Sequence, residues 1–215
     1  MTPIGRAAVA AIVVVLVVAL VYAWRHSLLN SAYVAASNGT MYAVSQAFPD
    51  RRQAAEALAE LERRAAALAQ SFVANHSAEP GERGEAARRI ARRFRPHAGV
   101  ENSPLNAARS TAYDQDKGRI TAMCLRERDP AESGDPATYD IAPMNTLTFV
   151  RIHELAHLGL DRFDHPDLFW RTDVELLREA ARLGLYRPVD YSLQPARYCG
   201  MTLNSNPMYH LGGLA

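Results

Sequence analysis

An uninterrupted apolar run near the N-terminus is the feature that most limits how this 215-residue chain can fold. Residues 7–24 read AAVAAIVVVLVVALVYAW, carry no charge and lie between Arg6 and Arg25. With a rise of about 1.5 Å per residue, they would form roughly 27 Å of helix, close to the thickness of a hydrocarbon core. A cleavable signal peptide has a shorter apolar region that ends in small residues. The sequence therefore predicts an uncleaved N-terminal transmembrane helix.

This helix divides the chain into three parts. Residues 1–27 are the predicted membrane anchor, 28–49 a juxtamembrane linker, and 50–215 one domain with a helical part (50–96) and a core (110–207). A single-pass protein of a virion or host membrane is expected. Because an arginine flanks each end of the apolar run, the side of the membrane that holds the domain stays open.

The charge of the chain argues against binding to nucleic acid through bulk charge. The 24 basic and 23 acidic residues leave a net charge of +1. Six arginines between Arg83 and Arg95 could contact phosphates or anionic lipid, but a solvated helix face is the favoured interpretation. We therefore expect no strong interaction with nucleic acid.

The domain shows the periodicity of a mainly helical α+β protein. Apolar residues recur every three or four positions between Leu58 and Phe72, which predicts a helix capped by Asp50. Three further helices are expected from about Glu85 to Pro96, from Asn145 as the cap through residue 160, and over 166–184. Residues 118–125 alternate in polarity like a strand, and the last thirty residues are expected to be irregular.

The helix that Asn145 opens contains the motif His153-Glu154-Leu155-Ala156-His157. Residues four apart share one face of a helix, so both imidazoles can reach one metal ion. Glu154 can then accept a proton from a water molecule on the metal instead of binding the metal itself. Imidazole ligands of this kind suit Zn²⁺.

A catalytic zinc ion has three protein ligands, and the third one must come from further along the chain. His165 is the preferred candidate because it follows a turn long enough to fold back and stands where the next helix begins. Glu175 and Glu179 on that helix are the alternatives, followed by Asp161 or Asp164.

The motif and the sequence after it, HPDLFW, resemble the small zinc metallopeptidases of the WLM and SprT type. In these families the third histidine opens a helix and an aromatic residue follows. Here two more residues separate the second and third histidines than in WLM proteins. The chain is more similar to WLM-like metallopeptidases of large DNA viruses and some algae. The residues that carry this likeness are Tyr113, Asp116–Gly118, Cys124–Arg126, Asn145, Phe149, Val150, His153–His157, His165, Phe169, Gly184–Tyr186, Asp190, Tyr191, Pro195 and Tyr198–Met201.

The resemblance covers about residues 110–207 and implies a minigluzincin-like domain with a small curved sheet over the HExxH helix. Residues 118–125 would then be the sheet edge above the zinc, with Thr121 and Met123 contacting an extended peptide by strand addition. Tyr198 or Tyr191 would donate a hydrogen bond to the oxyanion.

The same resemblance suggests roles for other residues. Asp190 could orient a ligand imidazole. Cys199 is expected to be a buried free thiol, with zinc ligation or pairing with Cys124 as alternatives.

The sequence therefore predicts a membrane-anchored zinc metallopeptidase of the HExxH type that acts on a peptide or protein substrate. The alternative is a catalytically silent zinc-binding structural or adaptor protein of a membrane, for example of a virion. The intact Glu154 favours the enzyme, because a structural site needs no general base.

Overall fold

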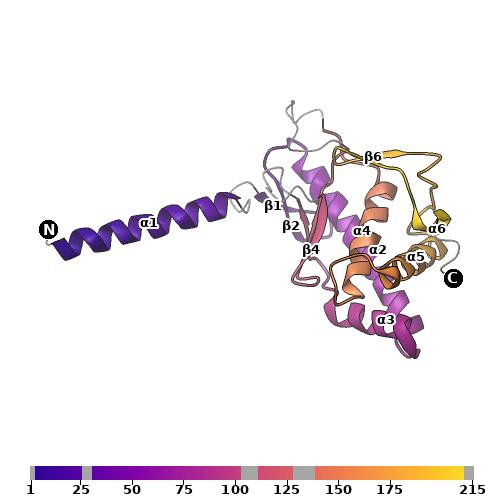
Figure 1. Ribbon diagram of the computed structural model, residues 1–215. Coiled ribbons are helices and arrows are strands. Elements are labelled where there is room, and N and C mark those ends of the chain that lie inside the picture. The colour runs from indigo at the N-terminus through magenta and orange to yellow at the C-terminus, as the bar shows by residue number, and fades with distance from the viewer. Residues whose placement is uncertain (1–2, 26–30, 103–110, 128–138, 211–215) are drawn as a thin grey trace.

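The computed structural model describes residues 3–25, 31–102, 111–127 and 139–210, and it has an α+β fold (Figure 1). The helices are α1 (Pro3–Arg25), α2 (Arg51–His76), α3 (Gly81–Arg93), α4 (Met144–Leu158), α5 (Asp167–Arg182) and α6 (Pro207–His210). The strands are β1 (Ser31–Ala35), β2 (Met41–Ser45), β3 (Gly99–Glu101), β4 (Ala112–Gln115), β5 (Ile120–Met123), β6 (Ala196–Tyr198) and β7 (Met201–Leu203).

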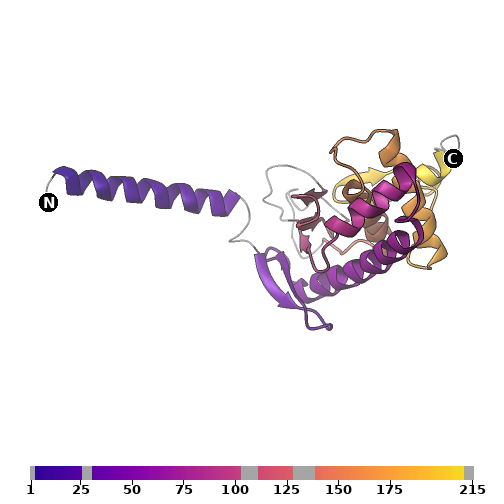
Figure 2. The same cartoon turned by 90° about the horizontal axis from the view of Figure 1, so that it is seen from below.

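Helix α1 projects away from the other elements in both views (Figures 1 and 2). Within the parts of the chain that the structure describes, no helix is both long and apolar enough to cross a membrane. This finding overturns the predicted transmembrane helix and the single-pass membrane location.

A β-hairpin lies in the segment that the sequence assigned to a linker. Strands β1 and β2 pair antiparallel, with Ser31 opposite Ser45. Tyr42 and Val44 of β2 are buried, and the backbone N–H of Ser45 donates a 2.8 Å hydrogen bond to Glu101 beyond the hairpin. The hairpin is therefore part of the folded domain, because alternate β2 side chains enter the core.

Four helices form the main layer, with α2 packed against α3, α4 and α5. Helix α4 is buried on nearly all sides, with 11 of its 15 residues inside the protein. The predicted caps of these helices have other partners: Asp50 accepts a 2.6 Å hydrogen bond from Arg126, and Asn145 exchanges hydrogen bonds with the backbone of Arg187. Both side chains thus tie a helix start to a distant segment instead of capping the helix.

A three-stranded sheet stands beside α4 in the order β3-β5-β4. Strand β5 pairs parallel with β3 and antiparallel with β4, so it is the central strand. The turn between β4 and β5 places Asp116, Lys117 and Gly118 at positive φ, a tight geometry that glycine adopts without strain. Strand β4 is an edge strand of this sheet, and it contacts α4.

The C-terminal region contains a short hairpin where the sequence indicated irregular structure. Strands β6 and β7 are joined by Cys199 and Gly200, both at positive φ, as two-residue hairpin turns require. Cys199 forms a disulfide with Cys124, which follows β5. The expected free thiol at Cys199 is therefore wrong, and the hairpin is covalently joined to the sheet region.

Candidate metal centre

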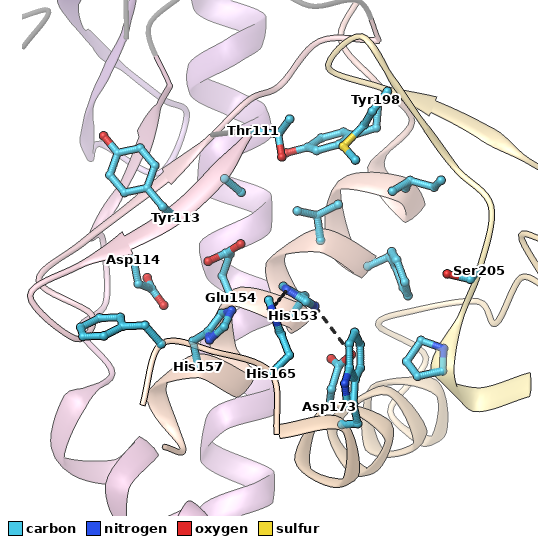
Figure 3. Close-up of a pocket in the computed structure, with 18 of the residues that line it drawn as sticks. Thr111, Tyr113, Asp114, His153, Glu154, His157, His165, Asp173, Tyr198 and Ser205 are labelled. Atoms are coloured by element: carbon cyan, nitrogen blue, oxygen red, sulfur yellow. Dashed lines mark hydrogen bonds and ion pairs between the residues drawn. The ribbon is translucent and has the colours of Figure 1, made fainter. Parts of the chain in front are cut away.

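Three histidines converge beside a cavity of about 460 Å³ between α4, α5, β4 and the β6–β7 hairpin (Figure 3). His153 and His157 lie one turn apart on α4, and His165 precedes α5. One ring nitrogen from each lies within 4.8 Å of the others, and the Nε2 atoms of His153 and His165 are 3.2 Å apart. This cluster could hold a metal ion.

An aromatic side chain fixes the arrangement of these rings. Phe169, fully buried on the first turn of α5, has its ring centroid 4.5–4.8 Å from the centroids of all three imidazoles. The ring of Trp170 stacks on His165 at 5.4 Å. Packing of α5 against α4 therefore brings His165 back to the HExxH helix, although it lies eight positions after His157 in the chain.

Two of the three histidines have a lowered pKa. Burial and the neighbouring His153 and His165 lower the pKa of His157 to about 4, and burial together with His153 lowers the pKa of His165. Both imidazoles are therefore neutral at physiological pH. Neutral imidazole is the form that binds a metal ion.

Asp173 of α5 contacts the third imidazole from behind. Its Oδ2 atom lies 3.8 Å from Nδ1 of His153, an ion-pair distance, and its side chain is almost completely buried. Burial lowers the pKa of His153, but Asp173 outweighs this effect, and the pKa is raised. The pair resembles the carboxylate–histidine arrangement that orients metal ligands.

The sequence assigned this orienting role to Asp190, which lies elsewhere. Asp190 accepts hydrogen bonds from Ser192 and faces His210 at 3.6 Å. The sequence offered one indication of this role for Asp173. It lies eight positions after His165, on the helix that His165 precedes.

Glu154 faces the same cavity from α4, on the side of β4 (Figure 3). It is 5% exposed, and burial, followed by the nearby charge of Asp114, raises its pKa to about 7. Asp114 is itself buried, and its Oδ1 atom accepts a 2.6 Å hydrogen bond from Thr121. Sequence reasoning did not select Asp114, because no spacing rule links β4 to α4.

Tyr198 lines the cavity from the end of β6. It is 1% exposed, and its hydroxyl has no hydrogen-bond partner among the described residues. Burial raises its pKa, so the hydroxyl keeps its proton. Tyr191, the other tyrosine considered for this role, packs edge-on against Phe149 and does not line the cavity.

The two residues predicted to contact a substrate peptide lie outside the cavity. Thr121 and Met123 belong to the central strand β5 and are buried. The prediction was wrong because it took β5 as the edge, whereas β4 covers it on that side. The cavity is lined instead by Thr111 and by β4 residues 112–114.

The other candidate ligands have different partners. Glu179 accepts hydrogen bonds from Ser71 and Arg182, and Glu175 lies 3.5 Å from Arg83. Asp161 pairs with Arg93, and Asp164 pairs with Arg162. Within the described part of the chain, none of these carboxylates belongs to the histidine cluster.

The arginines between Arg83 and Arg95 mostly contact the protein itself. Arg83 and Arg89 pair with Glu79 and Glu85, and Arg88 and Arg93 donate to backbone carbonyls. These four of the six arginines of this segment thus have partners within the protein.

Two viral proteins match parts of this chain. An uncharacterized protein of Acanthamoeba polyphaga mimivirus is 32% identical over 106 residues, which are 49% of this chain and 49% of that protein. An uncharacterized protein of Invertebrate iridescent virus 6 is 39% identical over 64 residues, 30% of this chain and 33% of its own length. The chain thus spans about half, or less, of the relatives that it matches. No family model matches the chain, and no solved structure matches it.

Proposed function

We propose that this protein is a zinc-dependent peptidase, as its resemblance to WLM and SprT metallopeptidases implies. The observation that carries the proposal is the convergence of three imidazoles and the Glu154 carboxylate on one cavity (Figure 3). A structural zinc site usually has four protein ligands, whereas three histidines leave one position for water or substrate.

The donor set fits zinc. Imidazole nitrogens are preferred zinc ligands, and one nitrogen from each of the three histidines lies within 4.8 Å of the others. His153, His157 and His165 would hold the ion, with Asp173 orienting His153. A bound zinc ion lowers the pKa of its water ligand to about 7 and polarises a substrate carbonyl.

Glu154 supplies the proton transfers in this proposal. With a pKa raised to about 7 by burial and by Asp114, it is placed to accept a proton from the attacking water at neutral pH. It then returns the proton to the amine that leaves the substrate. Its position next to His153 and one turn before His157 keeps it at the cavity without making it a ligand.

Tyr198 and strand β4 complete the proposed site. The Tyr198 hydroxyl is a buried donor with no partner among the described residues, and donating to the developing oxyanion would satisfy it. The edge strand β4 offers backbone groups along the cavity, to which an extended peptide could pair. A peptide substrate would therefore lie along β4 and across the histidines.

The test compares Glu154→Gln with Glu82→Gln, which changes an exposed glutamate on α3 whose side chain is 64% exposed. We expect Glu154→Gln to retain one zinc per chain but to lower kcat for peptide hydrolysis at least 100-fold, because it removes the general base. Glu82→Gln should behave like the native protein. Metal content is measured by mass spectrometry, and hydrolysis with unstructured protein substrates.

Unchanged hydrolysis by Glu154→Gln would exclude this mechanism. If the native protein binds zinc and zinc removal only lowers its stability, while no peptide is cleaved, the silent structural role replaces the enzyme.

A further inference from the structure

The cavity beside the histidines extends well beyond the space for a metal ion and a water molecule. Its volume of about 460 Å³ lies in the range of small-molecule sites, whereas a water molecule occupies roughly 30 Å³. Part of the cavity is therefore available to groups of the substrate on either side of the reacting bond.

Besides Glu154 and Asp173, two charged side chains from neighbouring positions of the chain line the cavity. Asp114 comes from β4, and Lys117 comes from the turn after it. The Lys117 ammonium donates to the backbone carbonyls of Leu160 and Arg162 and lies 3.9 Å from the ring centroid of Phe163. In the close-up, Asp114 and Ser205 lie on opposite sides of the three histidines (Figure 3).

Apolar side chains from four elements also line the cavity. Phe149 and Val150 precede His153 by four and three residues on α4, so this apolar lining begins within one helical turn of the metal site. Met201 and Leu203 of β7 and Pro207 of α6 contribute from the C-terminal region, and Trp170 from α5. We name these six residues the apolar wall.

A charged substrate side chain against this wall would lose part of its hydration without gaining a charged partner from the six wall residues. Asp173, a carboxylate of the same cavity lining, is buried and paired with His153. An unpaired charge is strongly disfavoured beside apolar side chains, whereas burial of an apolar side chain is favourable in proportion to the area that it removes from water. Met201 is 46% exposed, and its flexible thioether can adapt to side chains of different shape.

We propose that the apolar wall is a specificity subsite that accepts a large apolar side chain, such as Leu, Phe or Met, of the residue next to the cleaved bond. This inference rests on the proposed peptidase function. It names peptides with an apolar residue at that position as the substrate class. The disulfide at Cys199 holds the β7 part of the wall in place.

The test uses the zinc-loaded full chain and acetylated, amidated decapeptides of Ala and Gly with one variable residue. Cleavage positions are identified by mass spectrometry. We expect kcat/KM to be about 10–100-fold higher for Leu or Phe than for Ala next to the cleaved bond, and lowest for Asp, because methylene groups discriminate to this extent in apolar pockets. Binding of the same peptides to Glu154→Gln by calorimetry measures the preference without hydrolysis.

A matched pair of variants assigns the preference to the wall. Met201→Glu should reduce the preference for Leu at least 10-fold and favour Lys, whereas Met41→Glu on β2, where Met41 is 53% exposed, should change neither. Both methionines are exposed, so neither change should disturb folding, which circular dichroism checks.

The outcomes separate the two proposals. Cleavage that is independent of the variable residue, or a preference unaffected by Met201→Glu, overturns the subsite and leaves the peptidase standing. Selective binding of Leu peptides to the chain without any hydrolysis supports the subsite and overturns the peptidase. Peptides that are neither bound nor cleaved overturn both.

Discussion

At the scale of single residues, the site depends on side chains that its motif does not contain. Asp173 contacts His153 from α5 and Asp114 faces Glu154 from β4, and each carboxylate changes the pKa of its neighbour. Phe169 packs against all three imidazoles. The HExxH motif thus contains two of the three candidate ligands and the Glu154 carboxylate, while residues of other elements influence the orientation and charge of these groups.

Asp173→Asn tests this dependence directly. We expect zinc affinity to fall about 10–100-fold, because the amide no longer stabilises the ligand orientation of His153. Asp190→Asn is the control. Asp190 accepts a hydrogen bond from Ser192 and is not part of the histidine cluster, so this change should leave the zinc affinity within about twofold of the native value. Competition with a fluorescent chelator measures both affinities. An equal loss in the two variants would contradict the assignment.

At the scale of elements, α5 positions the third histidine and is held against α2 by a polar cluster. Glu179 of α5 accepts a 2.5 Å hydrogen bond from Ser71 and a 3.1 Å bond from Asn75, both on α2. Hydrogen bonds from Arg182, together with Ser71, lower the pKa of Glu179 to about 2. A residue that the sequence offered as a metal ligand therefore connects two helices.

The lowered pKa gives this contact a defined pH dependence. Since the ordinary pKa of a glutamate is 4.5 and the folded value is about 2, the contact stabilises the fold above pH 4.5 and loses this effect as the pH falls towards 2. Glu179→Gln should lower the free energy of unfolding by about 1 kcal/mol at pH 7, and the difference should shrink below pH 4.5.

Urea unfolding at several pH values measures this difference. Glu85→Gln, which removes an exposed pair with Arg89, is the control and should change stability by less than about 0.5 kcal/mol. A difference that stays constant down to pH 2 would show that the Glu179 carboxylate does not titrate as described.

At the scale of the whole molecule, one covalent bond joins the sheet region to the hairpin that carries Tyr198 and the β7 part of the apolar wall. Cys124 and Cys199 are separated by 75 residues, so their disulfide closes a long loop. Closing such a loop restricts the unfolded chain and stabilises the fold by about 3–4 kcal/mol. The disulfide thus affects both stability and the shape of the cavity.

Replacing both cysteines by alanine should lower the free energy of unfolding by about 3–4 kcal/mol. Zinc content should remain unchanged, because all three histidines are placed by the packing of α4 and α5, while peptide hydrolysis should fall as the Tyr198 hairpin loosens. Urea unfolding, metal analysis and peptide assays measure these effects.

A phosphine reductant provides the matched control for this variant. It should lower the stability of the native protein and leave the double variant unaffected. A native protein whose unfolding midpoint does not change after complete reduction would exclude a stabilising role for this bond.

Features that depend on local spacing could be predicted from the amino-acid sequence. A period of 3.6 residues predicted the helices around Leu58 and the HExxH motif, the four-residue spacing placed His153 and His157 on one face, and ligand chemistry favoured His165. The α+β class also followed from these patterns.

Contacts between distant segments could not be predicted and became visible in the folded protein. Strand order placed β4 instead of β5 beside the histidines, helix packing selected Asp173 over Asp190, and folding of the C-terminal region brought Cys199 to Cys124. The apolar N-terminal run looked like a membrane span because hydropathy and length are all that a sequence offers there, yet no described helix meets the requirements of a span. Local periodicity encodes which face of an element is buried, but contacts between distant segments depend on packing of the whole core, which no spacing rule contains.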